Sequence, residues 1–357
     1  MGAATADNLI ARHEAFLHCR AADGPLVGCW VGGYFPVEQF PRGASGWPAS
    51  ALLQPQDVSF APFAEDYEEL YQSHRACDDD FFYVGSAYWG IPWLEAILGC
   101  PVSVAAANCR TEPVCENLDN AEGLEVNVET DAWLDALLRF TQDLVEFSRG
   151  RFPVCAPLLR GAGDAASAML GGTAFVMSLL EEPEKMKKLL AHCAAVRLAV
   201  LRRLAEILPA WHGTHAAGGC PSKVWCRGTV AYYQEDVAAL LNPGLFREFL
   251  LPAARQACQG AEVNFIHLHS ACLYPVDILL EERAFDVLEI NIDHRGAGPA
   301  VPQLIETFQK IQRAGRPLVL WGQCSPDDWD LICRRLSPIG LSLQPMVRSP
   351  QTKWRNP

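Results

Sequence analysis

Eight short apolar segments rich in β-forming residues recur along this chain, and most of them are followed by an amphipathic, helix-like segment. The apolar segments lie at residues 26–32, 81–85, 153–159, 230–236, 264–269, 287–293, 317–322 and 340–345. The helix-like segments between them include 64–75, 131–149, 183–208, 243–259, 301–314 and 326–336. Strands that alternate with helices predict a parallel sheet, and eight such units predict an α/β protein built as a single (β/α)8 TIM barrel.

The segments outside this repeat predict the domain organisation. Residues 7–22 have an amphipathic helical pattern that ends at the turn residues 23–25, so residues 1–25 are predicted to be an N-terminal helical extension. Residues 101–130 have no regular period, which indicates a loop insertion. A chain of 357 residues fits one large barrel with insertions, and residues 26–357 are predicted to form that domain.

Composition and charge indicate which classes of partner the protein can bind and in which cellular compartment it is expected. The 29 basic and 42 acidic residues give a net charge of −13, which disfavours nucleic acid and anionic membrane surfaces. No apolar run reaches the roughly 18 to 20 residues that span a membrane, and residues 1–9 lack the pattern of a secretory signal. The 14 cysteines do not have the spacing of a small disulfide-stapled scaffold. We therefore expect a cytoplasmic protein with reduced thiols.

The segment 264–272 contains the residues that carry the clearest chemical signal. His267 and His269 lie two apart near the end of a predicted strand, so their side chains should point to the same face. In a parallel β/α fold, ligands bind at the carboxyl ends of the strands. Two converging imidazoles can hold a metal, hold an anion or move a proton. The alternative is a histidine pair that only hydrogen-bonds to its neighbours at a strand end.

Other polar or aromatic residues gather at the predicted strand ends. Tyr88 and Trp89 follow the second strand, and the later strands end near Arg160, Asp164, Gln234, Asp236, Glu289, Asn291, Asp293, Gln323, Cys324 and Gln344. Each of them alone is explained as a buried polar group that satisfies a neighbour, or as loop packing. A set this polar, from several separate strands, predicts a binding site at one end of the barrel. The chain has no glycine-rich phosphate loop and no paired-cysteine zinc motif.

Several stretches together resemble the uroporphyrinogen decarboxylase superfamily, over about residues 80–345. They are Leu-Arg-Gly-Ala-Gly-Asp at 159–164, Asn-Pro-Gly-Leu-Phe-Arg-Glu-Phe-Leu-Leu-Pro at 242–252, His-Leu-His at 267–269 and Trp-Gly-Gln-Cys-Ser-Pro at 321–326. The superfamily also holds zinc-dependent methyltransferases that act with corrinoid proteins or coenzyme M, and cobalamin-independent methionine synthases. Residues 91–100 resemble the branch close to the methyltransferases.

The chain departs from the porphyrinogen decarboxylases at two places. Their arginine-rich Arg-Gln-Ala-Gly-Arg segment, which binds the many carboxylates of the substrate, is replaced here by residues 31–36, which contain no arginine. Their late Gly-His-Gly motif is replaced by Leu-Gln-Pro at 343–345. A closed site without arginine clamps would leave several substrate charges unpaired, which argues against a porphyrinogen substrate.

The resemblance to the methyltransferase branch implies a metal site. Those enzymes bind zinc through a His-x-Cys pair and a later cysteine; His267 matches the first ligand, and His269 stands where the cysteine is expected. The later cysteine falls near Leu343, which cannot bind zinc, so Cys324, Cys272 or Glu289 is expected to complete the set. The catalytic residues implied are His267, His269 and Asp236. The substrate-binding residues predicted from the strand ends are Tyr88, Trp89, Arg160, Gln234, Asn291 and Gln344.

These features favour three functions, taken in order. The first is a zinc-dependent methyltransferase that acts with a thiol or with a corrinoid carried by a partner protein. The second is a metal-free decarboxylase of a small carboxylic acid, in which Arg160 pairs with the carboxylate and His267 or His269 donates a proton. The third is a barrel that binds a small molecule without catalysis. The resemblance also implies a homodimer.

Overall fold

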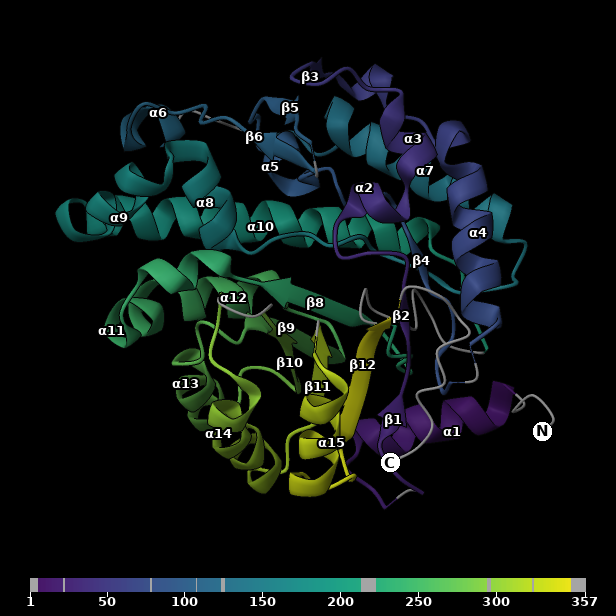
Figure 1. The fold of residues 1–357 in the computed structure, drawn as a ribbon. Coiled ribbons are helices and arrows are strands. Elements are labelled where there is room, and N and C mark those ends of the chain that lie inside the picture. Colours follow the sequence, from purple (N-terminus) through teal and green to yellow (C-terminus); the bar gives the residue numbers. More distant parts are fainter. Residues whose placement is uncertain are drawn as a thin grey trace.

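The principal sheet of the protein is curved and entirely parallel (Figure 1). The computed structural model describes residues 6–21, 23–77, 79–106, 108–122, 126–212, 223–293, 297–322 and 324–347, so Gln323 lies outside the described residues. The strands are, in spatial order, β1 (Leu26–Val27), β12 (Leu341–Val347), β11 (Leu318–Gly322), β10 (Val287–Ile292), β9 (Val263–His269) and β8 (Val230–Gln234), and β2 (Trp30–Val31) also pairs with β12. The predicted parallel α/β arrangement is therefore correct.

Two predicted strands are shorter than expected and form a separate parallel pair. These are β4 (Gly85–Ser86) and β7 (Val154–Cys155), where residues 81–85 and 153–159 were predicted to be strands. Pro153 and Pro157 lack the N–H group that a sheet ladder needs, which explains the short β7. Among the described residues no strand ladder joins this pair to the principal sheet, although the amide of Asp80 donates to the carbonyl of Val27 at 2.8 Å. Closure into a barrel stays a prediction.

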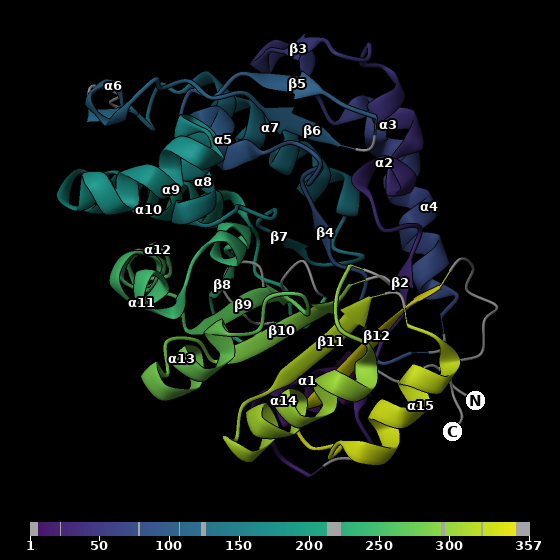
Figure 2. The same ribbon diagram turned by 60° about the vertical axis from the view of Figure 1, so that its left-hand side comes forward.

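The predicted helices agree closely with the observed ones. The matching helices are α1 (Ala6–Leu17), α4 (Ala64–Arg75), α7 (Ala132–Ser148), α10 (Pro183–Ile207), α14 (Val301–Arg313) and α15 (Pro326–Arg335). The others are α2 (Pro36–Gln39), α3 (Pro41–Ser45), α5 (Trp93–Ile97), α6 (Leu118–Glu122), α8 (Ala162–Leu170), α9 (Gly172–Glu181) and α13 (Pro275–Glu282). Helices α13, α14 and α15 cover the outer side of β9 to β12, as both views show (Figures 1 and 2).

The predicted helix 243–259 is divided into three pieces. It begins at α11 (Pro243–Leu245), where the side chain of Asn242 accepts a hydrogen bond from the amide of Leu245 at 3.0 Å. A π-helical turn over Phe246–Leu250 follows, and then α12 (Leu251–Ala257). Pro252 lies in the first turn of α12, and a proline has no N–H to continue a helix upstream of it. The regular α-helix is therefore interrupted next to Pro252, the residue that lacks a backbone N–H donor.

The predicted insertion at 101–130 contains regular structure of its own. Strands β5 (Val102–Val104) and β6 (Cys109–Thr111) form an antiparallel sheet with β3 (Leu52–Leu53), which comes from the earlier loop region. Strands of two or three residues are too short for an alternating pattern to be detected. Within the described chain, no single helix is long and apolar enough to cross a membrane; α8 and α9 pass that test only as a pair bent by 106°.

The register of the principal sheet places the predicted functional residues side by side. His267 on β9 lies opposite Glu289 on β10 and Gln234 on β8. His269 lies opposite Asn291 on β10, which in turn lies opposite Trp321 on β11. Because all these strands run in the same direction, their carboxyl ends meet at one edge of the sheet. The sheet therefore brings these polar side chains into one row.

Candidate active site

A cavity of about 180 Å³ opens over this edge of the sheet. Aromatic rings form much of its wall, and the histidine pair forms part of its floor. The lining residues are Trp30, Tyr34, Gln39, Phe40, Tyr67, Leu70, His74, Tyr83, Val84, Ser86, Trp89, Leu158, Lys223, Tyr232, Gln234, His267, His269, Glu289, Asn291 and Trp321. A concave, largely apolar space with a few convergent polar groups is typical of a small-molecule site.

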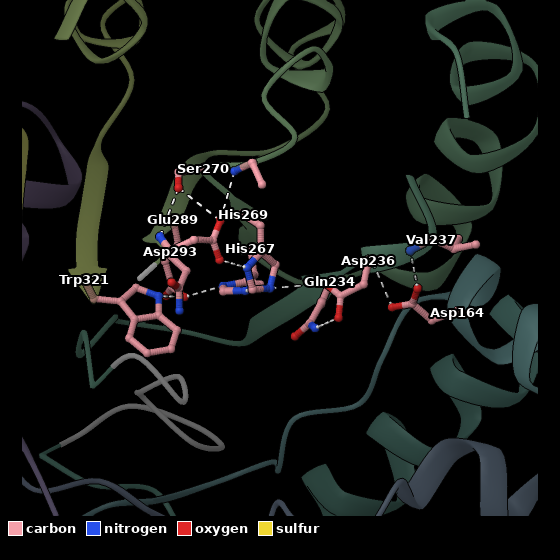
Figure 3. Close-up of polar contacts among 12 residues, drawn as sticks. Asp164, Gln234, Asp236, Val237, His267, His269, Ser270, Glu289, Asp293 and Trp321 are labelled. Atoms are coloured by element: carbon pink, nitrogen blue, oxygen red, sulfur yellow. Dashed lines mark hydrogen bonds and ion pairs between the residues drawn. The ribbon is translucent and has the colours of Figure 1, made fainter. Parts of the chain in front are cut away.

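His267 is held in one orientation from below by Glu289 (Figure 3). Both side chains are buried, and the distance from His267 Nδ1 to Glu289 Oε1 is 2.8 Å. The same oxygen accepts hydrogen bonds from Tyr232 Oη at 2.5 Å and Trp321 Nε1 at 2.9 Å. An ionised carboxylate only accepts, so His267 donates through Nδ1, which leaves Nε2 as the ring nitrogen directed away from Glu289.

His269 is oriented in the same way by Asp293. The distance from His269 Nδ1 to Asp293 Oδ1 is 2.7 Å, and Asp293 Oδ2 accepts from Ser270 Oγ at 3.0 Å and from the amide of Ala271 at 2.9 Å. Burial acts to lower the pKa of His269, but the hydrogen bond to Asp293 and the nearby charge of Asp236 together raise it. The cationic form of His269 is therefore favoured relative to a free histidine.

The Nε2 atoms of the two histidines converge above the sheet. They are 3.4 Å apart, with the ring planes at 90° to each other. Asp236 Oδ1 lies 3.6 Å from Nε2 of His269, and the three side chains offer ligand atoms that all lie within 4.8 Å of one another. Two neutral imidazoles that both donate through Nδ1 would direct two lone pairs at each other. This arrangement is favourable only when a proton or a cation lies between them.

Asp236 is positioned by hydrogen bonds between two turns, those at 159–164 and 234–237. The carboxylate of Asp164 accepts from the amides of Asp236 at 3.0 Å and Val237 at 2.7 Å (Figure 3). In return, Glu235 accepts from the amides of Gly163 at 3.0 Å and Asp164 at 3.1 Å. The side chain of Gln234 donates to Asp236 Oδ2 at 2.5 Å. These contacts fix the backbone of Asp236, and the side-chain amide of Gln234 holds its carboxylate.

Gly161 allows this close approach, and its replacement by alanine tests the contact. A Cβ atom there would lie 2.2 Å from the backbone oxygen of Gln234, so the two turns would have to separate. We expect Gly161→Ala to lower the free energy of unfolding by about 1–3 kcal/mol, measured from the denaturant midpoint. Gly46→Ala is the control, because the nearest atom to its Cβ is 3.9 Å away and its φ is −70°. Equal midpoints for the two variants would contradict the contact.

Some of the other predicted site residues lie at the cavity, and some do not. Trp89, Gln234 and Asn291 line the cavity, and Glu289 lies beneath His267. Tyr88 packs among aromatic rings in the core, Gln344 is buried on β12, and neither lines the cavity. Arg160 Nε makes an ion pair with the buried carboxylate of Glu95 at 2.6 Å. Cys324 packs against the core and does not belong to the described group of converging ligand atoms.

Sequence analysis did not single out four residues that shape the cavity. Two of them could have been found from the strand pattern. Tyr232 lies two residues before Gln234 on β8 and so shares its face, and Trp321 lies opposite Asn291 in the register. Lys223 and His74 carry no such signal. Lys223 precedes β8 outside any regular element, and His74 lies near the end of α4.

Comparison with known proteins adds a fold likeness. The fold resembles that of a methyltransferase from Methanosarcina mazei. The TM-score is 0.64 at 16% sequence identity, over 97% of this chain and 94% of that one. A mannanase from Bacillus subtilis aligns with a TM-score of only 0.41 at 10% identity, over 98% of this chain and 89% of that one. A score this low does not establish a shared fold. No protein-family model and no curated protein sequence matches the chain. The superfamily assignment therefore stays a prediction, and the likeness concerns the fold alone.

Proposed function

We propose that this protein is a zinc-dependent methyltransferase of the uroporphyrinogen decarboxylase superfamily, acting with a thiol or with a corrinoid carried by a partner protein. In this proposal the sheet closes into a (β/α)8 barrel. Strands β1 and β2, which both pair with β12, count as one position, so the principal sheet supplies six positions and the β4–β7 pair supplies two. The observation that carries the function is the convergence of Asp236 with two imidazoles that line the cavity and are each oriented by a carboxylate.

Two of the three distances between the ligand atoms are close to those around a tetrahedral zinc ion. Zinc–nitrogen bonds of about 2.0–2.1 Å in a tetrahedron place two nitrogens roughly 3.3–3.4 Å apart. The separation of the His267 and His269 Nε2 atoms is 3.4 Å, and that from His269 Nε2 to Asp236 Oδ1 is 3.6 Å. Histidines that bind zinc usually donate their other ring N–H to a carboxylate, as both do here. Asp236 thus replaces Cys324 and Glu289 as the third ligand that we propose.

The protein's own residues supply orientation and exclusion of water. A zinc ion at this point would lower the pKa of a bound thiol and so produce a nucleophilic thiolate. Glu289 and Asp293 fix the two imidazoles, which keeps both Nε2 lone pairs directed into the cavity. The stacked rings of Trp30 and Trp321, with centroids 4.8 Å apart, form an apolar wall beside them. The fold likeness to a methyltransferase supports this choice of reaction.

Metal analysis of the protein, purified without a chelator or a histidine tag, tests the proposal. We expect about one zinc per chain by mass spectrometry, because three ligand atoms from one face are already in place. Two histidines and one carboxylate also suit iron(II), so iron is measured in the same sample. The variant His269→Ala should lose the metal.

The matched control is His192→Ala, which removes a half-buried histidine on α10 outside the cavity. It should retain wild-type zinc. Absence of zinc from the wild-type protein after reconstitution would reject the methyltransferase proposal, as would retention of zinc by His269→Ala. Bound iron without zinc would show that both the metal and the reaction that we propose are wrong.

The metal-free decarboxylase is the second candidate, and one observation favours it. The raised pKa of His269 favours a protonated ring, which would donate to Nε2 of His267 across the 3.4 Å contact. Such a proton could be delivered to the carbon that loses carbon dioxide. In this reaction Arg160 would pair with the substrate carboxylate through its remaining N–H donors, since its Nε already pairs with Glu95. Release of carbon dioxide by metal-free protein would identify this reaction.

A further inference from the structure

A buried lysine borders the same cavity as the histidine pair. Lys223 is 8% exposed, and its Nζ lies 2.8 Å from Nε2 of His74. An ammonium group only donates, so Nε2 of His74 is the acceptor. Nζ also lies 4.8 Å from the centre of the Trp30 ring. Burial lowers the pKa of Lys223 to about 8, which leaves most of the side chain cationic at neutral pH.

This ammonium group lacks the partner that buried lysines normally have. In the part of the chain that the structure describes, no carboxylate makes an ion pair with Lys223, and its one hydrogen-bond partner is His74. Burial lowers the pKa of His74 well below its usual value, so that ring is neutral and does not compensate the charge. Buried lysines are rare unless they are paired. Among the described residues, two of its three N–H donors therefore have no hydrogen-bond acceptor.

The backbone at this position is also unusual. Lys223 has φ of +64°, in the left-handed region that a residue with a side chain seldom adopts. Residues held in such conformations cluster at ligand sites, where the surrounding structure over-determines them. Here the strained backbone and the cavity occur together at one residue. This is a second observation, independent of the missing carboxylate, that points to a ligand.

We propose that Lys223, with His74, binds a single carboxylate group of the substrate at the end of the cavity away from the histidine pair. Two free N–H donors match the two oxygens of one carboxylate. A group with two negative charges fits less well, because Lys223 is the one lysine or arginine among the described residues that line the cavity. Glu289 also lines the cavity, and the negative charge of Asp79 acts on Lys223. The sequence predicted Arg160 for this role, whereas this proposal assigns it to Lys223.

The two ends of the cavity are joined by a continuous aromatic wall. Lys223 lies over Trp30, Trp30 stacks on Trp321, and Trp321 packs beside His267 with ring centroids 5.9 Å apart. A substrate with a carboxylate at one end, an apolar middle and a thiol at the other would contact Lys223, the tryptophan rings and the histidine pair. The identity of the thiol end rests on the proposed function, whereas the carboxylate site rests on Lys223 and His74.

Calorimetric binding of matched pairs of small molecules tests this inference. The probes are mercapto-acids from 3-mercaptopropionate to 6-mercaptohexanoate, each compared with the mercapto-alcohol of the same length. We expect the best acid to bind the wild-type protein at least ~10-fold more tightly than its alcohol, since a hydrogen bond to a charged group is worth about 1.5–3 kcal/mol. Lys223→Met should abolish this preference while the alcohol binds as before.

The control variant is Lys310→Met, which removes an exposed lysine that pairs with Asp277 on the surface. It should keep the wild-type preference for the acid. Equal affinities for acid and alcohol in the wild-type protein would overturn the inference. So would a preference that persists in Lys223→Met.

Two further measurements keep the test decisive. The first applies if Lys223→Met does not fold. Reductive methylation of Lys223 in the wild-type protein is then measured by mass spectrometry with hexanoate or hexanol present. Equal protection by the two ligands would overturn the inference. The same two ligands are titrated into protein stripped of metal. A preference for hexanoate there supports the Lys223 site even when no zinc is found, which separates failure of this inference from failure of the proposed function.

Discussion

Alanine in place of His267 is expected to abolish metal binding. The substitution removes one of the two converging Nε2 atoms, and the remaining pair, His269 and Asp236, offers one nitrogen and one exposed carboxylate. Loss of an outer partner of a metal ligand already lowers affinity by about 10–100-fold, so loss of a ligand should exceed ~100-fold. Competition against a chromophoric chelator, together with metal analysis, measures this change.

The same variant also leaves Glu289 with one donor fewer in a buried position, so folding must be checked separately. Circular dichroism and the unfolding midpoint provide that check. A folded His267→Ala protein that still holds zinc near the wild-type level would show that the metal lies elsewhere. The second described group of potential ligands, Cys29, Cys77 and Asp79, would then be the place to look.

The histidine pair was predictable from sequence because strand geometry decides it. Residues two apart on a strand share a face, so His267 and His269 had to point the same way. Their carboxylate partners lie opposite them or just beyond the next strand, since Glu289 faces His267 in the register and Asp293 follows β10. Once two neighbouring parallel strands are identified, the side chains at their carboxyl ends must meet.

The residues that were not predictable depend on contacts between distant segments. Arg160 has the position of a substrate-binding residue, but Glu95, far away in sequence, pairs with it. Cys324 lies beyond the end of β11, where strand alternation no longer fixes the direction of a side chain. Lys223 belongs to no regular element, so no period marks it. Such residues are placed by tertiary packing, which a pattern along one chain does not encode.

Alanine in place of Glu289 is expected to be the most destabilising change in the site. One oxygen of this buried carboxylate accepts hydrogen bonds from Tyr232, His267 and Trp321, and all three lose that acceptor at once. Removal of one partner from a buried charged contact typically lowers the free energy of unfolding by about 3–5 kcal/mol. Denaturant unfolding measures the loss.

Glu289→Gln separates the structural role of this side chain from its effect on the metal. Its volume is nearly that of glutamate and its amide oxygen can still accept, so the expected loss of stability is only about 1 kcal/mol. The neutral amide orients His267 less strongly, so zinc affinity should fall by about 10–100-fold. Glu65→Ala, at a carboxylate that is 81% exposed, should change stability by no more than about 0.5 kcal/mol. If Glu289→Ala were no more destabilising than Glu65→Ala, Glu289 could not be the shared acceptor that holds His267 in place.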